Sequence, residues 1–363
     1  SRPTMSKSAI LLLNLGSPRS ASVADVRAYL REFLSDPRVL DAHPLARSLV
    51  LNLFILPFRP RRSAAAYASI WTPEGSPLVT MSRRQRDLLA ARVGAPVHLA
   101  MRYGEPSVPE TMARIVADGA ERLFLVPLYP HYAMSSYETA VVQATEEAAR
   151  QAPSMRVDLL QPFYGDPDYI GALADTAWPY LERGFDKLVF SFHGVPERHL
   201  RKSDSSHAHC LVARDCCRRA HPAHATCYRH QCVRTMDLLV ERLGVRPEKA
   251  VLAFQSRLGR DPWLAPQTDQ TVERLAREGC KRLLVICPSF VTDCLETLEE
   301  IAIGCRETFE KAGGEHLRLI PCLNDSPRWI DFLAARCGAW LSGATADPVK
   351  TASRSESSGP AEP

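Results

Sequence analysis

One histidine stands where an apolar run of the sequence ends. His193 directly follows residues 188–192 and precedes Gly194. The ligand of a parallel sheet lies beyond the carboxyl ends of the strands, so we expect this imidazole to face a cleft. A single histidine is more often structural, but at a strand end a neutral imidazole can accept a proton or bind a metal ion. His193 is therefore the first candidate for chemistry.

Three carboxylates fall on one face of a predicted helix. Asp293, Glu296 and Glu300 are spaced at i, i+3 and i+7, directly after the last apolar run. A structural explanation is that Asp293 caps the helix and Glu296 completes a capping box. Capping does not explain Glu300, which lies a full turn further along. A stripe of carboxylates entering a cleft suits a divalent cation or a chain of proton transfers.

Cysteine and histidine are concentrated in one segment. Five of the eleven cysteines and five of the eleven histidines lie between residues 207 and 232. Together these side chains suit zinc or an iron–sulfur cluster, and thiolates alone suit the cluster best. The segment contains no C-x-x-C pair, which weakens the zinc-finger interpretation. The alternative is a reduced loop that binds metal ions adventitiously.

An apolar stretch with a basic end forms the fourth candidate. Residues 45–58 are mostly aliphatic or aromatic, and Arg59, Arg61 and Arg62 follow them. Such a stretch is more commonly a core helix, but it also fits an apolar lip that touches a membrane or an apolar ligand. The pattern alone leaves both interpretations open.

The elements that must position these groups occur twice along the chain. Residues 10–18 match 188–196 at an offset of 178, residues 122–130 match 282–290 at 160, and residues 99–103 match 252–256 at 153. The falling offset indicates extra residues in the first half, near 45–75. Internal repetition of this kind predicts two similar halves.

Each matched fragment is a short apolar run, typical of a strand buried on both faces of a parallel sheet. Helical patterns at residues 22–34, 107–118 and 268–278 lie between them. We therefore predict an α/β fold with two similar doubly wound (Rossmann-like) domains and a functional cleft between them. The expected divisions are domains at 5–170, with the lip at about 45–75, and at 180–341, with a Cys/His-rich insertion at 205–227, and a disordered tail at 342–363.

Composition narrows the function classes. With 363 residues, 45% hydrophobic and 24% charged, the chain is not disordered, collagenous or coiled-coil. Its 45 basic and 41 acidic residues leave a net charge of +4, too small for a dedicated nucleic-acid binder. No apolar run reaches the roughly 18 residues of a membrane span. The N-terminus has no signal or transit character, so we expect a cytoplasmic protein with reduced cysteines.

Separate motifs occur in order along the chain. They are LLLNLGSP (11–18), EGSPL (74–78), MRYG (101–104), PLYPHY (127–132), SFHGVPERH (191–199), FQSRLG (254–259) with PWLAPQT (262–268), and TDCLETLEEI (292–301). Together, and in this order, they resemble the signatures of the ferrochelatases, the terminal enzymes of heme synthesis. The resemblance runs from about residue 10 to 341.

This resemblance implies insertion of ferrous iron, as substrate, into protoporphyrin IX to form protoheme with release of two protons. His193 matches the active-site histidine of the family and Glu296 its essential glutamate, so the pair would contact the iron. Asp293 and Glu300 match the acidic line behind the glutamate, which would relay protons or metal. The porphyrin pocket would comprise Leu15, Arg102, Tyr103, Tyr129, Ser256 and Trp263.

Two departures from the animal members stand out. Cys294 occupies a position where those members carry a histidine, so a second imidazole beside Glu296 is absent. The Cys/His segment looks like an internal insertion of the kind that carries a [2Fe-2S] cluster in some bacterial ferrochelatases. The resemblance implies the ligand set Cys210, Cys216, Cys217 and Cys227, with Cys232 as the alternate.

The implied partners are a porphyrin and ferrous iron, with no nucleic acid. A peripheral contact with the inner face of the membrane and a homodimer both stay open. Within the enzyme class, the rivals are a coproporphyrin ferrochelatase and a cobaltochelatase of the same fold. From another class, the rival is an iron–sulfur redox or iron sensor on an inactive chelatase scaffold. Such a sensor would keep the cysteines and tolerate the loss of His193 and Glu296.

Overall fold

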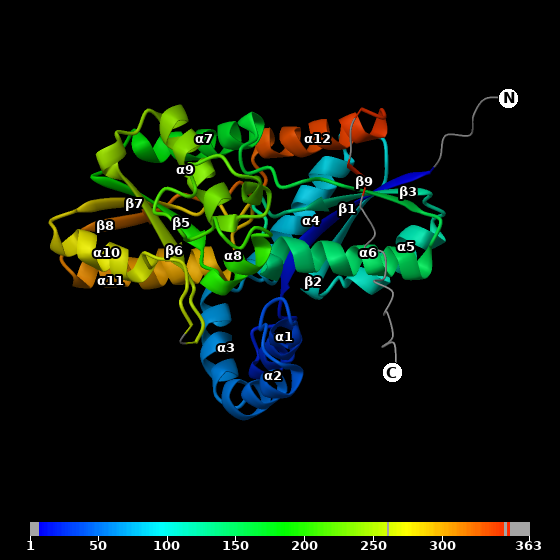
Figure 1. The fold of residues 1–363 in the computed structure, drawn as a ribbon, viewed down its shortest axis with the longest axis horizontal. Coiled ribbons are helices and arrows are strands. Elements are labelled where there is room, and N and C mark those ends of the chain that lie inside the picture. Colours follow the sequence, from blue (N-terminus) through cyan, green and yellow to red (C-terminus); the bar gives the residue numbers. More distant parts are fainter. Residues whose placement is uncertain (1–6, 260, 345–346, 349–363) are drawn as a thin grey trace, which may run out of the picture.

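Two parallel sheets lie side by side in the computed structural model, which describes residues 7–259, 261–344 and 347–348 (Figure 1). The first has the order β2-β1-β3-β4, with β9 added antiparallel to β4, and the second has the order β6-β5-β7-β8. The strands are β1 (Ser8–Ser17), β2 (Val97–Gly104), β3 (Arg122–Pro127), β4 (Arg156–Leu159), β5 (Lys187–His193), β6 (Ala250–Gln255), β7 (Arg282–Ile286), β8 (His316–Leu319) and β9 (Asp347–Pro348).

The register of the sheets confirms the internal repeat. Leu12 of β1 pairs with Leu99 of β2, and Phe190 of β5 pairs with Leu252 of β6, which are the same offsets of 178 and 153 residues that the fragments have. The pairing of β1 with β3 and of β5 with β7 likewise keeps the offset of 160. The predicted α/β fold with two similar parallel sheets is therefore confirmed.

Helices and short π and 3₁₀ segments connect the strands. They are α1 (Val23–Ser35), α2 (Pro44–Val50), η1 (Leu51–Ile55), α3 (Arg59–Ile70), α4 (Pro77–Ala90), α5 (Val108–Ala117), η2 (Met134–Glu138), α6 (Thr139–Gln151), α7 (Pro167–Leu181), α8 (Glu197–Ser203), η3 (Pro222–Ala225), α9 (Tyr228–Leu243), η4 (Pro247–Lys249), α10 (Thr268–Arg277), η5 (Glu296–Cys305), α11 (Arg306–Lys311) and α12 (Pro327–Leu341). The three predicted helices correspond to α1, α5 and α10. Serine side chains cap α1 and α5, because Ser22 and Ser107 each accept a main-chain N–H of the first turn.

Alternate side chains of each central strand enter different cores. Ile10 and Leu12 face a core that runs under both sheets and includes residues of α4, α7, α9 and α12. Leu11 and Leu13 face a second core formed with α5 and α6. Val189 faces a third, formed with α10, η5 and α11. Burial on both faces explains the unbroken apolar runs of the sequence.

The end of the chain returns to the first sheet. Trp340 of α12 stacks on Phe124 of β3 at 5.1 Å between ring centroids, and its Nε1 donates to Asp158 at 2.8 Å. The predicted disorder of residues 342–363 is wrong for β9, because main-chain pairing with β4 holds Asp347–Pro348. Residues 345–346 and 349–363 of that prediction lie outside the described residues.

The extra residues of the first half form a helical projection. Helices α1, α2 and α3 extend from one side of the molecule, near the junction of the two sheets (Figure 1). Their inner side chains form a separate core that includes Tyr29, Tyr67 and Tyr103, against which Leu258 and Leu295 of the second half pack. No described helix is long and apolar enough to cross a membrane.

Candidate functional site

His193 ends β5, and its imidazole is fixed from several sides. Its Nδ1 lies 2.6 Å from the carbonyl oxygen of Gly194, so Nδ1 donates and the neutral ring keeps a lone pair on Nε2. The main-chain N–H donates to Ser289 Oγ at 3.2 Å, and Phe290 packs edge-on at 6.1 Å. Burial lowers the pKa of His193, opposed by the nearby carboxylate of Glu296. The ring is thus a neutral proton acceptor.

Glu296 and Glu300 lie together behind the end of β6. Gln255 donates through Nε2 to the carbonyl oxygen of Glu296 at 2.8 Å. Ser256 donates its N–H to Glu300 Oε1 at 2.9 Å, and its hydroxyl also donates to this carboxylate. Burial raises the pKa of Glu300 to about 7, against these bonds. A carboxyl with that pKa can both take up and release a proton near neutral pH.

The predicted α-helix over the acidic stripe is wrong in two respects. The segment that carries Glu296 and Glu300 is a π-helix, η5, and Asp293 precedes it. Thr297 accepts the N–H of Cys294 at 3.0 Å through its hydroxyl, which satisfies this donor outside the helix. The wider turn keeps Glu296 and Glu300 on one side, and π-helical turns are frequent at functional sites.

Asp293 belongs to a different network from the two glutamates. Its carboxylate accepts from Asn324 Nδ2 at 2.8 Å and from the Thr297 hydroxyl at 2.9 Å. The main-chain carbonyl oxygen of Asn324 in turn accepts a hydrogen bond from Gln85 Nε2 at 2.7 Å. The structure therefore brings Glu296 and Glu300 together and places Asp293 in bonds that join α4 to η5.

Arg102 and Tyr103, at the end of β2, converge on a carboxylate that the sequence did not single out. Asp36, which is buried, accepts from Arg102 at 2.6 Å and from the Tyr103 hydroxyl at 2.7 Å. The Thr139 hydroxyl also donates to it. Although burial works against it, these bonds hold the pKa of Asp36 below its usual range. No motif marks Asp36, because its partners are 66 to 103 residues away in the sequence.

The other residues predicted to line the porphyrin pocket lie near the junction of the two sheets. Leu15 packs against both the first-sheet core and the projection. Tyr129 is buried, and its hydroxyl has no hydrogen-bond partner. Trp263 donates through Nε1 to Leu258 O at 2.9 Å, and its ring would lie 3.3 Å from a Cβ at residue 194. A side chain at Gly194 would also meet Gln255 O at 2.8 Å, so only glycine fits there.

Two buried tyrosines near Glu296 were missed by the sequence analysis. Burial, with a smaller contribution from Glu296, raises the pKa of both Tyr29 and Tyr67 well above 10. They come from α1 and α3 of the projection and pack edge to face, with centroids 6.3 Å apart. The projection therefore supplies part of the surroundings of Glu296, on the side opposite the second sheet.

The four cysteines of the predicted ligand set converge in the structure. The thiol of Cys227 interacts with those of Cys210 and Cys217, and the thiol of Cys217 also interacts with that of Cys216. All four are buried. Burial raises the pKa of Cys210 and of Cys216, so these thiols need a cation to become thiolates.

Two further residues, Arg229 and Cys232, lie near the four cysteines. Arg229 Nη1 lies 3.3 Å from Cys217 Sγ and 4.0 Å from Cys216 Sγ. Cys232 contacts the hydroxyl of Tyr228 and also lies near Cys217, in the same core as Cys210 and Cys227. In the part of the chain that the structure describes, no three His, Cys, Asp or Glu side chains surround a single ion position.

The apolar stretch of residues 45–58 is not a core helix. Two rows of apolar side chains at helical spacing are exposed along α2, η1 and the following turn. The first row is Leu45, Leu49 and Leu53, and the second is Val50, Phe54 and Phe58. Ile55 points inward and packs in the core of the projection. One face of the projection thus presents large apolar side chains to solvent.

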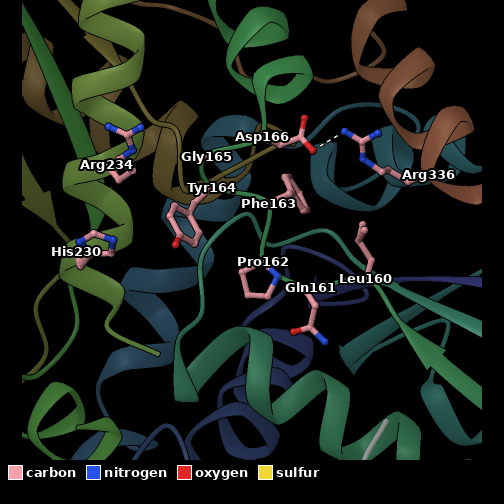
Figure 2. Close-up of a pocket in the computed structure, with 10 residues that line it drawn as sticks. All are labelled: Leu160, Gln161, Pro162, Phe163, Tyr164, Gly165, Asp166, His230, Arg234 and Arg336. Carbon is pink, nitrogen blue, oxygen red and sulfur yellow. Dashed lines mark hydrogen bonds and ion pairs between the residues drawn. The ribbon is translucent and has the colours of Figure 1, made fainter. Parts of the chain in front are cut away.

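A cavity of about 550 Å³ lies away from these residues, after strand β4 (Figure 2). Residues 160–166 form its floor, His230 and Arg234 of α9 line one side, and Arg336 of α12 lines the other. Arg336 is ion-paired with Asp166. None of the predicted porphyrin or iron residues lines this cavity.

Comparison with known proteins places the whole chain in one group. A family model described as Ferrochelatase matches residues 7–339. The chain is 54% identical over 341 residues to the ferrochelatase of Opitutus terrae, covering 93% of this chain and 99% of that protein. It is 51% identical over 335 residues to that of Ectopseudomonas mendocina, covering 92% and 98%.

Solved structures agree on the fold. The sirohydrochlorin chelatase SirB of Bacillus subtilis subspecies spizizenii, in complex with cobalt, superposes with a TM-score of 0.53 at 13% identity, covering 93% of this chain and 96% of that chain. SirB from Bacillus subtilis with Fe³⁺ gives a TM-score of 0.51 at 14% identity, covering 93% and 97%. At such identities the likeness concerns the two-sheet architecture alone.

Proposed function

This chain belongs to the ferrochelatase family, and we propose that it is the lyase that inserts ferrous iron into protoporphyrin IX in heme biosynthesis. The reaction forms protoheme and releases two pyrrole protons. The observation that carries the proposal is the half-buried imidazole of His193, which ends β5 and interacts with the nearby Glu296 carboxylate.

His193 has the properties of the group that takes a pyrrole proton. Its Nδ1 is committed to Gly194 O, so Nε2 is the free acceptor. Because burial lowers its pKa, the ring is uncharged at neutral pH and able to accept. The nearby Glu296 carboxylate favours the imidazolium once it forms. The pair therefore lowers the cost of moving a positive charge into a buried cleft.

Glu300 is suited to carry protons or iron between the cleft and solvent. Its pKa of about 7 allows it to exchange a proton without a large energetic step. Ser256 holds one carboxylate oxygen through its N–H, which fixes Glu300 behind Glu296. Both protons of the porphyrin and the incoming cation can pass along this pair of carboxylates.

Anaerobic iron insertion, assayed with protoporphyrin IX and coproporphyrin III in parallel, tests the proposal. Loss of the acceptor in His193→Ala should lower turnover at least about a hundredfold. His316→Ala, which removes an exposed histidine, is the control and should turn over normally. Retained turnover in His193→Ala would contradict the assignment. Faster use of coproporphyrin III, or cobalt insertion without iron insertion, would favour the corresponding rival.

We also propose that the chain holds a [2Fe-2S] cluster on Cys210, Cys216, Cys217 and Cys227. The support is their mutual contact, their burial and the chemistry of four thiols. Arg229, beside two of them, would offset part of the negative charge of the thiolates. When bound, such a cluster supplies one-electron redox chemistry.

The cluster has a spectroscopic test. Protein purified without oxygen should show visible absorbance that dithionite bleaches, and Cys→Ser changes at the four positions should abolish it. Cys232→Ser tests the alternate ligand, because this buried thiol lies near both Tyr228 and Cys217. A cluster that survives Cys210→Ser but not Cys232→Ser would replace Cys210 by Cys232 in the ligand set.

The exposed apolar face of residues 45–58 supports a peripheral membrane contact. The porphyrin is apolar in its centre, and an enzyme that receives it from a bilayer needs a surface that dips into the headgroup region. Arg61 and Arg62 are exposed next to this face and would meet anionic lipids. We place the protein in the cytoplasm, at the inner face of the membrane.

A further inference from the structure

An array of four imidazoles lies beside the four thiols and takes no part in the chemistry proposed above. His209 and His221 are stacked, with ring centroids 3.9 Å apart and planes at 4°. His224 and His230 are stacked at 3.6 Å and 7°. His209 and His224 meet edge to face at 5.2 Å, which joins the two stacks.

Three polar atoms converge at the centre of the array. The Nε2 atoms of His209 and His224 are 3.2 Å apart. The carbonyl oxygen of Cys216 lies 2.9 Å from the first and 2.8 Å from the second. The three atoms form a triangle with every edge at hydrogen-bond distance.

Hydrogen bonds alone do not account for this triangle. Each Nε2 atom carries at most one proton, and the carbonyl oxygen carries none. Three contacts would need three protons, and two are available at most. One edge must therefore bring two hydrogens or two lone pairs together. A cation at the centre would satisfy all three atoms at once, through two imidazole lone pairs and the oxygen.

The edges have the size that a six-coordinate ion requires. Adjacent ligands about 2.1 Å from an octahedral ion lie about 3.0 Å apart, and the three edges span 2.8 to 3.2 Å. Two imidazoles and one oxygen on one face of an ion leave positions for water, as in the 2-His-1-carboxylate sites of ferrous iron. Imidazole nitrogen suits zinc, iron, nickel and copper rather than magnesium or calcium.

The outer members of the array hold the inner rings in place. His221 covers one face of His209, and its Nδ1 accepts the N–H of Ala223 at 3.2 Å. His230 covers one face of His224, and its Nδ1 donates to the carbonyl oxygen of Cys217 at 2.6 Å. Stacking against these outer rings restricts the orientations that the two inner imidazoles can take.

We propose that His209 Nε2, His224 Nε2 and the Cys216 carbonyl oxygen form a site for a borderline divalent cation of the ferrous iron and zinc class. This site lies outside the porphyrin cleft and uses none of the thiols. The insertion would then bind a labile metal ion next to the catalytic domain, in addition to the cluster.

Zinc binding to the His193→Ala variant tests the site, because this background removes a ligand of the cleft. We expect one Zn²⁺ per chain by calorimetry, with affinity at least tenfold weaker after a further His209→Ala or His224→Ala change. His207→Ala is the matched control, since His207 is exposed in the same loop and outside the array. Equal zinc binding in all of these variants would overturn the proposal.

Two further measurements separate loss of the site from loss of the fold. His224→Gln keeps an amide that can donate to Cys216 O, so it should retain the visible spectrum and melting temperature while losing zinc affinity. Zinc-edge X-ray absorption of the His193→Ala protein, with the array intact, should show scattering from two imidazoles. Zinc surrounded by sulfur, or by oxygen without imidazole, would contradict the assignment.

Discussion

At the scale of single residues, Glu300 illustrates how burial brings the pKa of an ordinary carboxyl close to neutral pH. Removal from water raises its pKa from 4.5 to about 7, although Ser256 bonds to its ionised form. Between these two pH values the folded protein holds a proton that the unfolded chain has lost. Stability must therefore fall as the pH rises from about 4.5 through 7, because the unfolded state binds fewer protons.

Replacing Glu300 by Gln should remove this pH dependence. The shift of roughly 2.5 pKa units corresponds to at most about 3 kcal/mol. Relative to the wild type, Glu300→Gln should gain up to that amount between pH 4.5 and 7.5, measured by urea unfolding at both pH values. Glu310→Gln, at an exposed carboxyl, is the control. A stability difference that stays constant with pH would show that Glu300 is ionised throughout.

The sequence predicted that several candidate residues lie at the ends of strands, and the structure places them there. His193 closes an apolar run, and so do Gln255 and Ser256, which the structure places beside Glu300. Asp36 and Tyr67 escaped notice because their contacts depend on how the projection packs against the sheets. Such contacts join residues far apart in the chain, and no local pattern encodes them.

At the scale of elements, the Cys/His insertion depends on one carboxylate. Asp204, at the end of α8, accepts the N–H groups of Ser206, His209 and Cys210, at 3.0, 3.0 and 2.9 Å. It also accepts the hydroxyl of Ser206 at 2.6 Å. These bonds fix the start of the loop that carries both the thiols and the imidazole array. Hydrogen bonds to a charged group contribute about 1.5–3 kcal/mol each.

We expect Asp204→Ala to lower the free energy of local opening of this loop by about 2 kcal/mol or more. Amide hydrogen exchange at His209 and Cys210 should then be at least about thirtyfold faster, and Asp204→Asn should have a smaller effect because one oxygen remains. Asp215→Ala, an exposed acid of the same loop, should leave both amides protected. Unchanged exchange in Asp204→Ala would mean that the thiols or their cofactor hold the loop by themselves.

The sequence predicted most elements but not the one nearest the chemistry. The repeat predicted the strands and their register, because a parallel sheet buries both faces and so imposes continuous apolar runs. It did not predict η5, since the residues of an α-helix and of a π-helix differ little in pattern. There the Thr297 hydroxyl accepts the N–H of Cys294, which lies just before the helix.

At the scale of the whole molecule, the projection extends from the candidate site to the surface. Its inner residues Tyr29 and Tyr67 face Glu296, while the rows that contain Leu53 and Phe54 face solvent. A substrate with an apolar centre would meet both sides of this one unit on its way in. The exposed face is therefore expected to bind bilayers, in line with its apolar rows and flanking arginines.

Replacing Leu53 and Phe54 by Ser should weaken liposome binding without unfolding the projection. The two side chains are 56% and 65% exposed, so the change removes little of the internal core, whereas Ile55 must be kept because it packs inside. Loss of two inserted apolar groups should cost about 3 kcal/mol, or roughly a hundredfold in partitioning. Sedimentation with anionic vesicles measures the effect, and Val212→Ser, 70% exposed on the insertion, is the control.

Porphyrin affinity, measured on the same variants in detergent-free solution, separates two roles of the projection. If its apolar face borders the mouth of the cleft as well as the bilayer, Leu53→Ser/Phe54→Ser should weaken both porphyrin binding and vesicle binding. If the face serves only the membrane, porphyrin affinity will stay constant while vesicle binding falls. Unchanged porphyrin affinity and unchanged vesicle binding would together show that the lip has no role in substrate delivery. A protein partner would then have to explain the exposed apolar rows.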